Sequence, residues 1–160
     1  MKAAEGALGR VFILRLEDGD VLPESIERFA AEKGISTGCA LFIGDVKDGN
    51  IVAGPRRPGL EKPEPLVLPV DGVHEVVAAG TSAPDSSGRP VLHIHGALGR
   101  AGHTATGCLR PGVTTWLVGE VVIFEILGIT AARLHDDLSG FDLLEIRQGI
   151  HNSDLKESSR

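Results

Sequence analysis

The chain alternates between short apolar runs and residues that form turns. Most of the runs are short and rich in valine, isoleucine and leucine, a composition that favours β-strands. The 21 glycines and nine prolines supply the turns between them. The sequence therefore predicts many strands, over residues 11–16, 35–46, 51–53, 66–70, 73–79, 91–98, 103–109, 117–129 and 141–147.

One segment between the first two predicted strands has helical periodicity instead. Pro23 suits the first helical position and Gly34 suits the end of a helix. Apolar residues recur in this segment at helical spacing, at Leu22, Ile26, Phe29 and Ala30. Strands outnumber helices, so the predicted fold class is α+β, a single domain with a mostly antiparallel sheet.

Local signals also predict the connections. Asp48, Gly49 and Asn50 are typical of a hairpin turn, which would pair strand 35–46 with strand 51–53. Residues 81–90 are polar and are expected to form a loop. The pattern over residues 131–138 is ambiguous.

Charge and composition exclude several classes of function. The 160 residues include 16 Lys and Arg against 22 Asp and Glu, and this net charge of −6 opposes binding to nucleic acid by charge alone. No run approaches the roughly 18–20 apolar residues of a membrane helix, and we expect no secretory signal because the first residues include no apolar stretch of the kind that such signals have. Cys39 and Cys108 are far apart in the sequence. We expect them to be buried free thiols and the protein to be cytoplasmic.

The histidines near residue 95 carry the most specific chemical signal. His93 and His95 are two residues apart on a predicted strand, so both side chains should lie on one face. His103 would join them there if the hairpin places it opposite Ala97, whereas a register shifted by one residue would put it on the other face. Three imidazoles around one point would suit Zn²⁺ with an open fourth position. The alternative is a row of half-exposed histidines that hydrogen-bond to their neighbours.

Three glutamates are candidates for the general base that a zinc-dependent enzyme would need: Glu75, Glu120 and Glu125. Glu120 and Glu125 lie in the apolar run 117–129 with opposite parity, so they should face opposite sides of the sheet. A carboxylate there needs a partner, and an ion pair, for example with Arg15, is the simpler interpretation. A DNA-bound regulator would instead need a basic stripe made by assembly, for which the candidates are Arg56, Arg57, Arg89 and Arg100 of several subunits.

Six segments, in this order, resemble the plants-and-prokaryotes conserved (PPC) domain. The resemblance extends over about residues 10–148, and the chain departs from the plant form of the third segment at Val73 and His74. The segments are LRLEDGD (14–20), TGCALFIG (37–44), GVHEVVAAGT (72–81), LHIHG (92–96), GEVVI (119–123) and DDLSGFDLL (136–144).

The resemblance implies a mixed sheet flanked by a few helices and assembly as a homotrimer. It divides the chain into an N-terminal extension (1–9), a PPC-like domain (10–148) and a flexible tail (149–160). It is to the stand-alone prokaryotic type without AT-hooks, whose members are often labelled DNA-binding, a label that the acidic charge opposes here. We expect a trimer with a His-rich site for a metal, with zinc as the candidate, or for a small ligand. The alternatives are a DNA-associated regulatory protein that acts as an oligomerisation or partner-binding module, with protein partners, and a zinc-dependent enzyme of unknown substrate.

Overall fold

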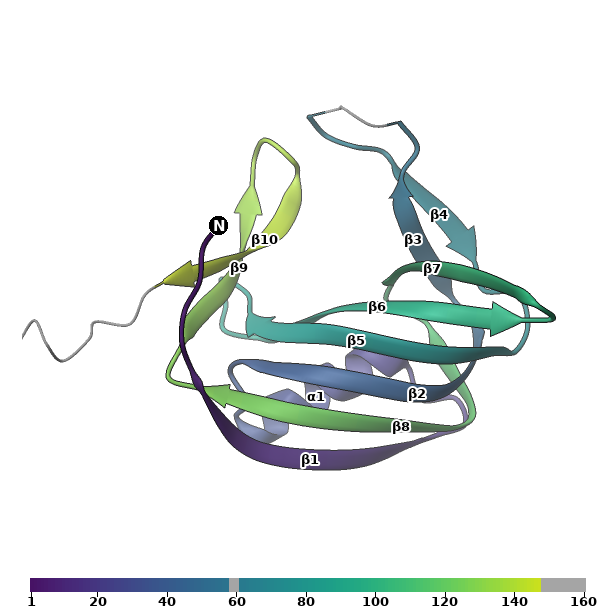
Figure 1. Ribbon diagram of the computed structural model, residues 1–160, viewed down its shortest axis with the longest axis horizontal. Helices are drawn as coiled ribbons and strands as arrows, with labels where there is room; N and C mark the ends of the chain where they lie inside the picture. Colours follow the sequence, from purple (N-terminus) through teal and green to yellow (C-terminus); the bar gives the residue numbers. More distant parts are fainter. Residues whose placement is uncertain (58–60, 148–160) are drawn as a thin grey trace, which may run out of the picture.

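Ten strands and one helix make up the residues that the computed structural model describes, 1–57 and 61–147 (Figure 1). Eight strands form one sheet in the order β1-β8-β2-β5-β6-β7-β3-β4, and β9 pairs with β10 in a separate hairpin. Every pairing between these strands is antiparallel. The elements are β1 (Ala7–Glu17), α1 (Leu22–Lys33), β2 (Gly38–Asp48), β3 (Asn50–Pro55), β4 (Pro65–Pro69), β5 (His74–Pro84), β6 (Pro90–Arg100), β7 (His103–Leu109), β8 (Thr114–Leu127), β9 (Thr130–Asp136) and β10 (Phe141–Arg147).

Helix α1 covers one face of the large sheet, behind β2 and β8 in Figure 1. Its apolar residues at helical spacing, Leu22, Ile26 and Ala30, are buried in the same cluster as Phe42 and Ile94 of the sheet. Each large apolar side chain buried in this way contributes about 1.5–3 kcal/mol. The periodicity of the sequence therefore identified the face of the helix that builds the core.

The boundaries of α1 follow the signals in the sequence. Pro23 lies in its first turn, and Gly34 ends it in the left-handed conformation with φ of 65°. The Gly34 N–H donates hydrogen bonds to the carbonyls of Ala30 and Ala31. This confirms the predicted end, since a residue with a Cβ rarely adopts that conformation.

The face of the large sheet opposite α1 carries apolar side chains that are exposed in the described part of the chain. Strand residues alternate between the two faces, so the neighbours of core residues point outward here. Five of these side chains are 42 to 80% exposed: Val11 and Ile13 of β1, Leu41 and Ile43 of β2, and Val77 of β5. We call this surface the open face.

The structure corrects four expectations. One helix, not a few, flanks the sheet in the described residues, and no parallel pair makes the sheet mixed there. The hairpin predicted at Gly49 is wrong, because β3 pairs with β7 and β4 and not with β2. The loop expected at 81–90 is shorter, since β5 continues to Pro84 and β6 begins at Pro90. The ambiguous segment 131–138 is mostly strand β9.

The ends of the chain add two observations. Strand β1 begins at Ala7, inside the expected extension 1–9, and the tail expected at 149–160 lies outside the described residues. Among the helices described, none has the length and apolar character needed to cross a membrane.

Candidate metal centre

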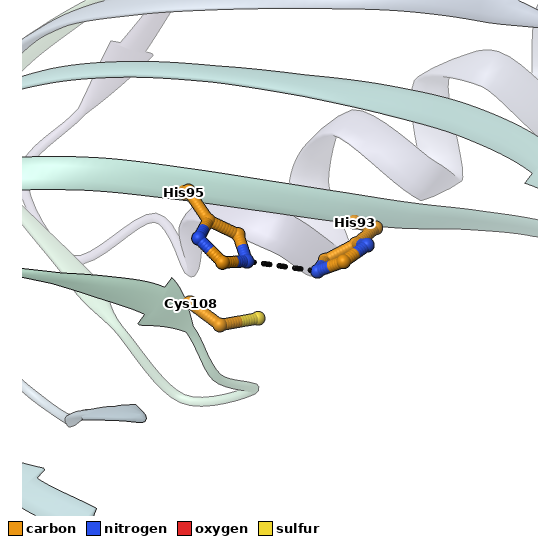
Figure 2. Close-up of side chains that lie close together, drawn as sticks. All are labelled: His93, His95 and Cys108. Carbon is orange, nitrogen blue, oxygen red and sulfur yellow. Dashed lines mark hydrogen bonds between the residues drawn. The ribbon is translucent and has the colours of Figure 1, made fainter. Parts of the chain in front are cut away.

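His93 and His95 lie side by side on the open face (Figure 2). Strand alternation places Leu92 and Ile94 in the core and both imidazoles on the opposite side. Their Nε2 atoms are 2.9 Å apart, so one ring donates a hydrogen bond to the other. The rings meet edge to face, with centroids 4.8 Å apart. The predicted pairing of these two side chains is confirmed.

Cys108 supplies a third donor atom that the sequence analysis missed. It lies on β7 directly opposite His95, and its side chain therefore shares the open face with the two histidines. The Cys108 Sγ and one nitrogen of each imidazole all lie within 4.8 Å of one another (Figure 2). Both cysteines are free thiols, as predicted, although each is half-buried rather than buried.

His103 is not brought to this cluster. The β6–β7 hairpin places it opposite Arg100, not opposite Ala97. Arg100 has the opposite parity to His93 and His95 on β6, so His103 lies on the other face of the sheet. The expectation that it would join the other two histidines is corrected by this register.

The turn itself held the signal for this register. Ala101 and Gly102 both have positive φ, 50° and 82°, and they connect the pair Arg100–His103 as a two-residue loop. Two-residue loops of type I′ have positive φ at both positions, which is why a glycine is common in them. With Ala101–Gly102 identified as the turn, counting back along the strands would have paired Cys108 with His95.

Charge near the cluster is positive. Burial lowers the pKa of His93 below its ordinary value, and the positive charges of Arg133 and Arg110, together with His95, lower it further. A neutral imidazole has a lone pair for a metal, so this environment favours the form that binds.

The three candidate glutamates do not reach the cluster. Glu125 is buried on the core face and is held by Arg10, whose Nε and Nη2 donate to its two oxygens at 2.8 and 2.7 Å. The ion pair interpretation is therefore confirmed for Glu125, with Arg10 in place of Arg15. Glu75 lies four residues beyond the cross-strand partner of His95, about 13 Å along β5. Glu120 lies on β8, three strands away from β6.

The arginines considered for a basic stripe are partly neutralised. Arg56 pairs with Glu64 at 3.0 Å, and Arg89 pairs with Asp85 at 2.9 Å. The Nη1 of Arg100 donates to the carbonyl of Val73 at 2.7 Å. Half of the proposed stripe is thus already engaged with acidic partners.

The donor set of the cluster fits a zinc ion. Imidazole nitrogen and thiolate sulfur are ordinary Zn²⁺ ligands, with bonds of about 2.0–2.1 and 2.3 Å. Two such Zn–N bonds at a tetrahedral angle separate their nitrogens by roughly 3.3 Å, close to the 2.9 Å between the Nε2 atoms of His93 and His95. Small side-chain adjustments would therefore suffice to accept the ion.

Comparison with solved structures gives the same fold. A PPC protein from Pyrococcus horikoshii is 28% identical, with a TM-score of 0.78 and coverage of 91% of this chain and 97% of that one. The metal-containing protein AF0104 from Archaeoglobus fulgidus is 29% identical, also with a TM-score of 0.78, covering 91% and 99%. A protein from Ralstonia eutropha, provisionally described as DNA-binding, is 18% identical with a TM-score of 0.68, covering 84% and 90%. The last of these shows the fold alone.

Sequence comparison identifies the family. The chain is 28% identical over 141 residues to the bifunctional protein GlmU of Synechococcus sp. (strain JA-3-3Ab), a match that covers 87% of this chain but only 21% of that longer protein. The model of the Plants and Prokaryotes Conserved domain, abbreviated PCC or PPC, matches residues 3–127. The chain belongs to the Plants and Prokaryotes Conserved domain family.

Proposed function

We propose that this PPC-domain protein binds one divalent transition metal ion per chain, Zn²⁺ first among them, through His93, His95 and Cys108. The observation that carries the proposal is the placement of three metal-binding atoms within 4.8 Å of one another on the open face. Zn²⁺ held by three protein ligands keeps a fourth position for water or a small ligand.

Two further points support a metal. One relative of the same fold, AF0104, is described as metal-containing and is 29% identical to this chain. The cluster also combines two imidazoles with a thiol, and such nitrogen and sulfur donors select zinc and similar ions over Mg²⁺ or Ca²⁺.

The proposal includes assembly as a homotrimer and a cytoplasmic location. The resemblance to the PPC family implies the trimer, and the apolar side chains of the open face are a surface that a second copy could cover. Two free cysteines suit the reducing cytoplasm.

The two alternatives have less support. A DNA-associated role would need a basic surface, but Arg56 and Arg89 are paired with acids and the net charge is −6. A zinc-dependent enzyme would need a carboxylate near the metal-bound water, and Glu75, Glu120 and Glu125 all lie away from the cluster.

Metal analysis of single variants tests the proposal. We expect elemental analysis of the mildly purified protein to find about one transition metal ion per chain, and the variants His93→Ala and His95→Ala to lose most of it. Cys108→Ala should also lose most of it, since a three-ligand site does not hold zinc firmly with two.

Matched controls distinguish the cluster from the rest of the chain. His103→Ala and His135→Ala should keep the metal, because the first residue lies on the other face and the second contacts Asp142 instead. Cys39→Ala is the control for Cys108→Ala. Less than a tenth of a metal ion per chain, or full metal in the variant lacking all three ligands, would rule the site out.

A further inference from the structure

Arg133 is a buried cation held by neutral groups. Its residue is only 6% exposed. Its Nη2 donates to the carbonyl oxygen and the hydroxyl oxygen of Thr81, at 2.9 and 3.0 Å, and its Nε donates to the carbonyl of Val91 at 3.3 Å. These bonds use three of the five guanidinium hydrogens, and the Nη1 group has no hydrogen-bond partner among the described residues.

The bonds of Arg133 place it next to the proposed metal ligands. Thr81 of β5 lies directly across from His93 of β6, so their side chains are close neighbours on the open face. Arg133 reaches Thr81 from β9, a strand outside the large sheet that contacts β5. A second cation, Arg110, lies two residues beyond Cys108, and its charge also acts on His93. The cluster is thus flanked by positive charge.

Arg133 makes no ion pair with the described residues. No carboxylate lies within ion-pair distance of its guanidinium in the described part of the chain. Asp142 is diagonal to it on β10 and its charge favours the charged form of Arg133, but its Oδ1 contacts the Nδ1 of His135 at 3.2 Å and it does not pair with the guanidinium. Buried charges in proteins are ordinarily paired, because an unpaired one has lost its hydration without compensation. An external anion would supply the ion-pair partner that Arg133 lacks among the described residues.

We propose that Arg133 and the His93–His95–Cys108 cluster form a binding site for a small oxyanion, a carboxylate or a phosphate group. The guanidinium of Arg133 would pair with one oxygen of the anion, and another oxygen would take the open position of the metal. The metal part of this inference rests on the proposed function. A divalent ion bound by two neutral imidazoles and one thiolate keeps a net positive charge, so it adds to the attraction of Arg133.

Titration of the wild-type protein with small probes tests the need for charge. Acetate and inorganic phosphate are the anions, acetamide is the uncharged match of acetate, and isothermal calorimetry is the readout, with and without Zn²⁺. We expect at least about ten-fold weaker binding of acetamide than of acetate, the usual effect of a lost charge-assisted hydrogen bond. The ratio between acetate and phosphate tells which oxyanion the site prefers. Equal binding of acetate and acetamide, or no binding of either anion, overturns the inference.

Variants assign the effect to Arg133. Arg133→Met keeps the length of the side chain without its charge and should weaken anion binding about ten-fold or more, whereas Arg133→Lys should keep part of it. Arg100→Met is the matched control, because Arg100 also donates to a backbone carbonyl but lies on the other face at the far end of β6. Unchanged anion binding in Arg133→Met overturns the inference. If that variant does not fold, the comparison of acetate with acetamide on the wild-type protein is the test of the inference.

Metal analysis of the same samples separates this inference from the proposed function. If the protein holds no metal but binds acetate in a way that Arg133→Met abolishes, the anion site stands and the proposed function fails. If the protein holds its metal and Arg133→Met binds the anion as tightly as the wild type does, the inference fails and the proposed function stands.

Discussion

Glu125 is a carboxylate among the core-facing apolar residues of β8. Its ion pair with Arg10 compensates the loss of hydration that burial causes. The Arg10 side chain and backbone N–H all donate to it, and these bonds lower the pKa of Glu125 to about 2. A folded-state pKa below the ordinary value of about 4.3 means that folding favours the ionised form. The pair therefore contributes its full stability above about pH 5, and this contribution is lost as the pH falls toward 2.

A double-mutant cycle measures this pair directly. We expect the coupling free energy between Arg10→Met and Glu125→Gln, from urea unfolding, to be largest at pH 7 and to shrink steadily as the pH falls from about 5 toward 2. The effects of other titrating groups on the free energy of unfolding are common to the wild type and the three variants, so they cancel in the coupling free energy. A coupling that does not change over this range would contradict the role given to ionised Glu125.

Strand pairing depends on glycines at points of close approach, and Gly80 of β5 is one of them. A Cβ built on Gly80 would lie 2.5 Å from the carbonyl oxygen of His93 and 2.7 Å from the Cα of Ile94. Both are backbone atoms of β6 that cannot move aside without shifting the strand. We expect Gly80→Ala to lower the free energy of unfolding by about 1–3 kcal/mol, the usual cost of overpacking.

Gly99 of β6 provides the control for that substitution. A Cβ there would meet nothing nearer than the Glu75 carbonyl oxygen at 3.8 Å, an ordinary contact. Gly99→Ala should therefore be neutral, or stabilise by about 0.4–1 kcal/mol because alanine restricts the unfolded chain. Urea unfolding of both variants checks the difference, and equal stabilities would show that β5 and β6 can separate at Gly80 at no cost.

The elements differ in how far the sequence could predict them. Helix α1 was predictable, because its periodicity and its terminal glycine are local signals. The pairing of β3 with β7 rather than β2 was not, since Gly49 turns the chain without deciding which distant strand it joins. The site lies between these two cases: strand alternation identified His93 and His95, whereas Cys108 could be placed only once Ala101–Gly102 was recognised as the turn that sets the register. Arg133 reaches the cluster from a strand outside the large sheet, so no local sequence pattern predicts that it lies near the histidines.

The two faces of the large sheet differ in what they carry. One face packs on α1 and holds the core. The other carries the candidate metal centre together with exposed apolar side chains. A shallow hollow of about 360 Å³, lined by residues such as Leu41, Val77 and His95, lies between the apolar surface and the cluster. A copy of the chain that covers the open face would therefore also shield the surroundings of the metal centre from water.

Light scattering with surface variants tests whether copies of the chain meet at the open face. We expect a mass about three times the 16.8 kDa of one chain at micromolar concentration. Val77→Glu should reduce it to that of a monomer, because Val77 is 67% exposed at the centre of the sheet and a buried carboxylate without a partner is costly. Val67→Glu, at an exposed position on the edge strand β4, should leave the mass unchanged. A monomeric wild-type protein would refute the trimer, and a trimeric Val77→Glu would show that the copies meet elsewhere.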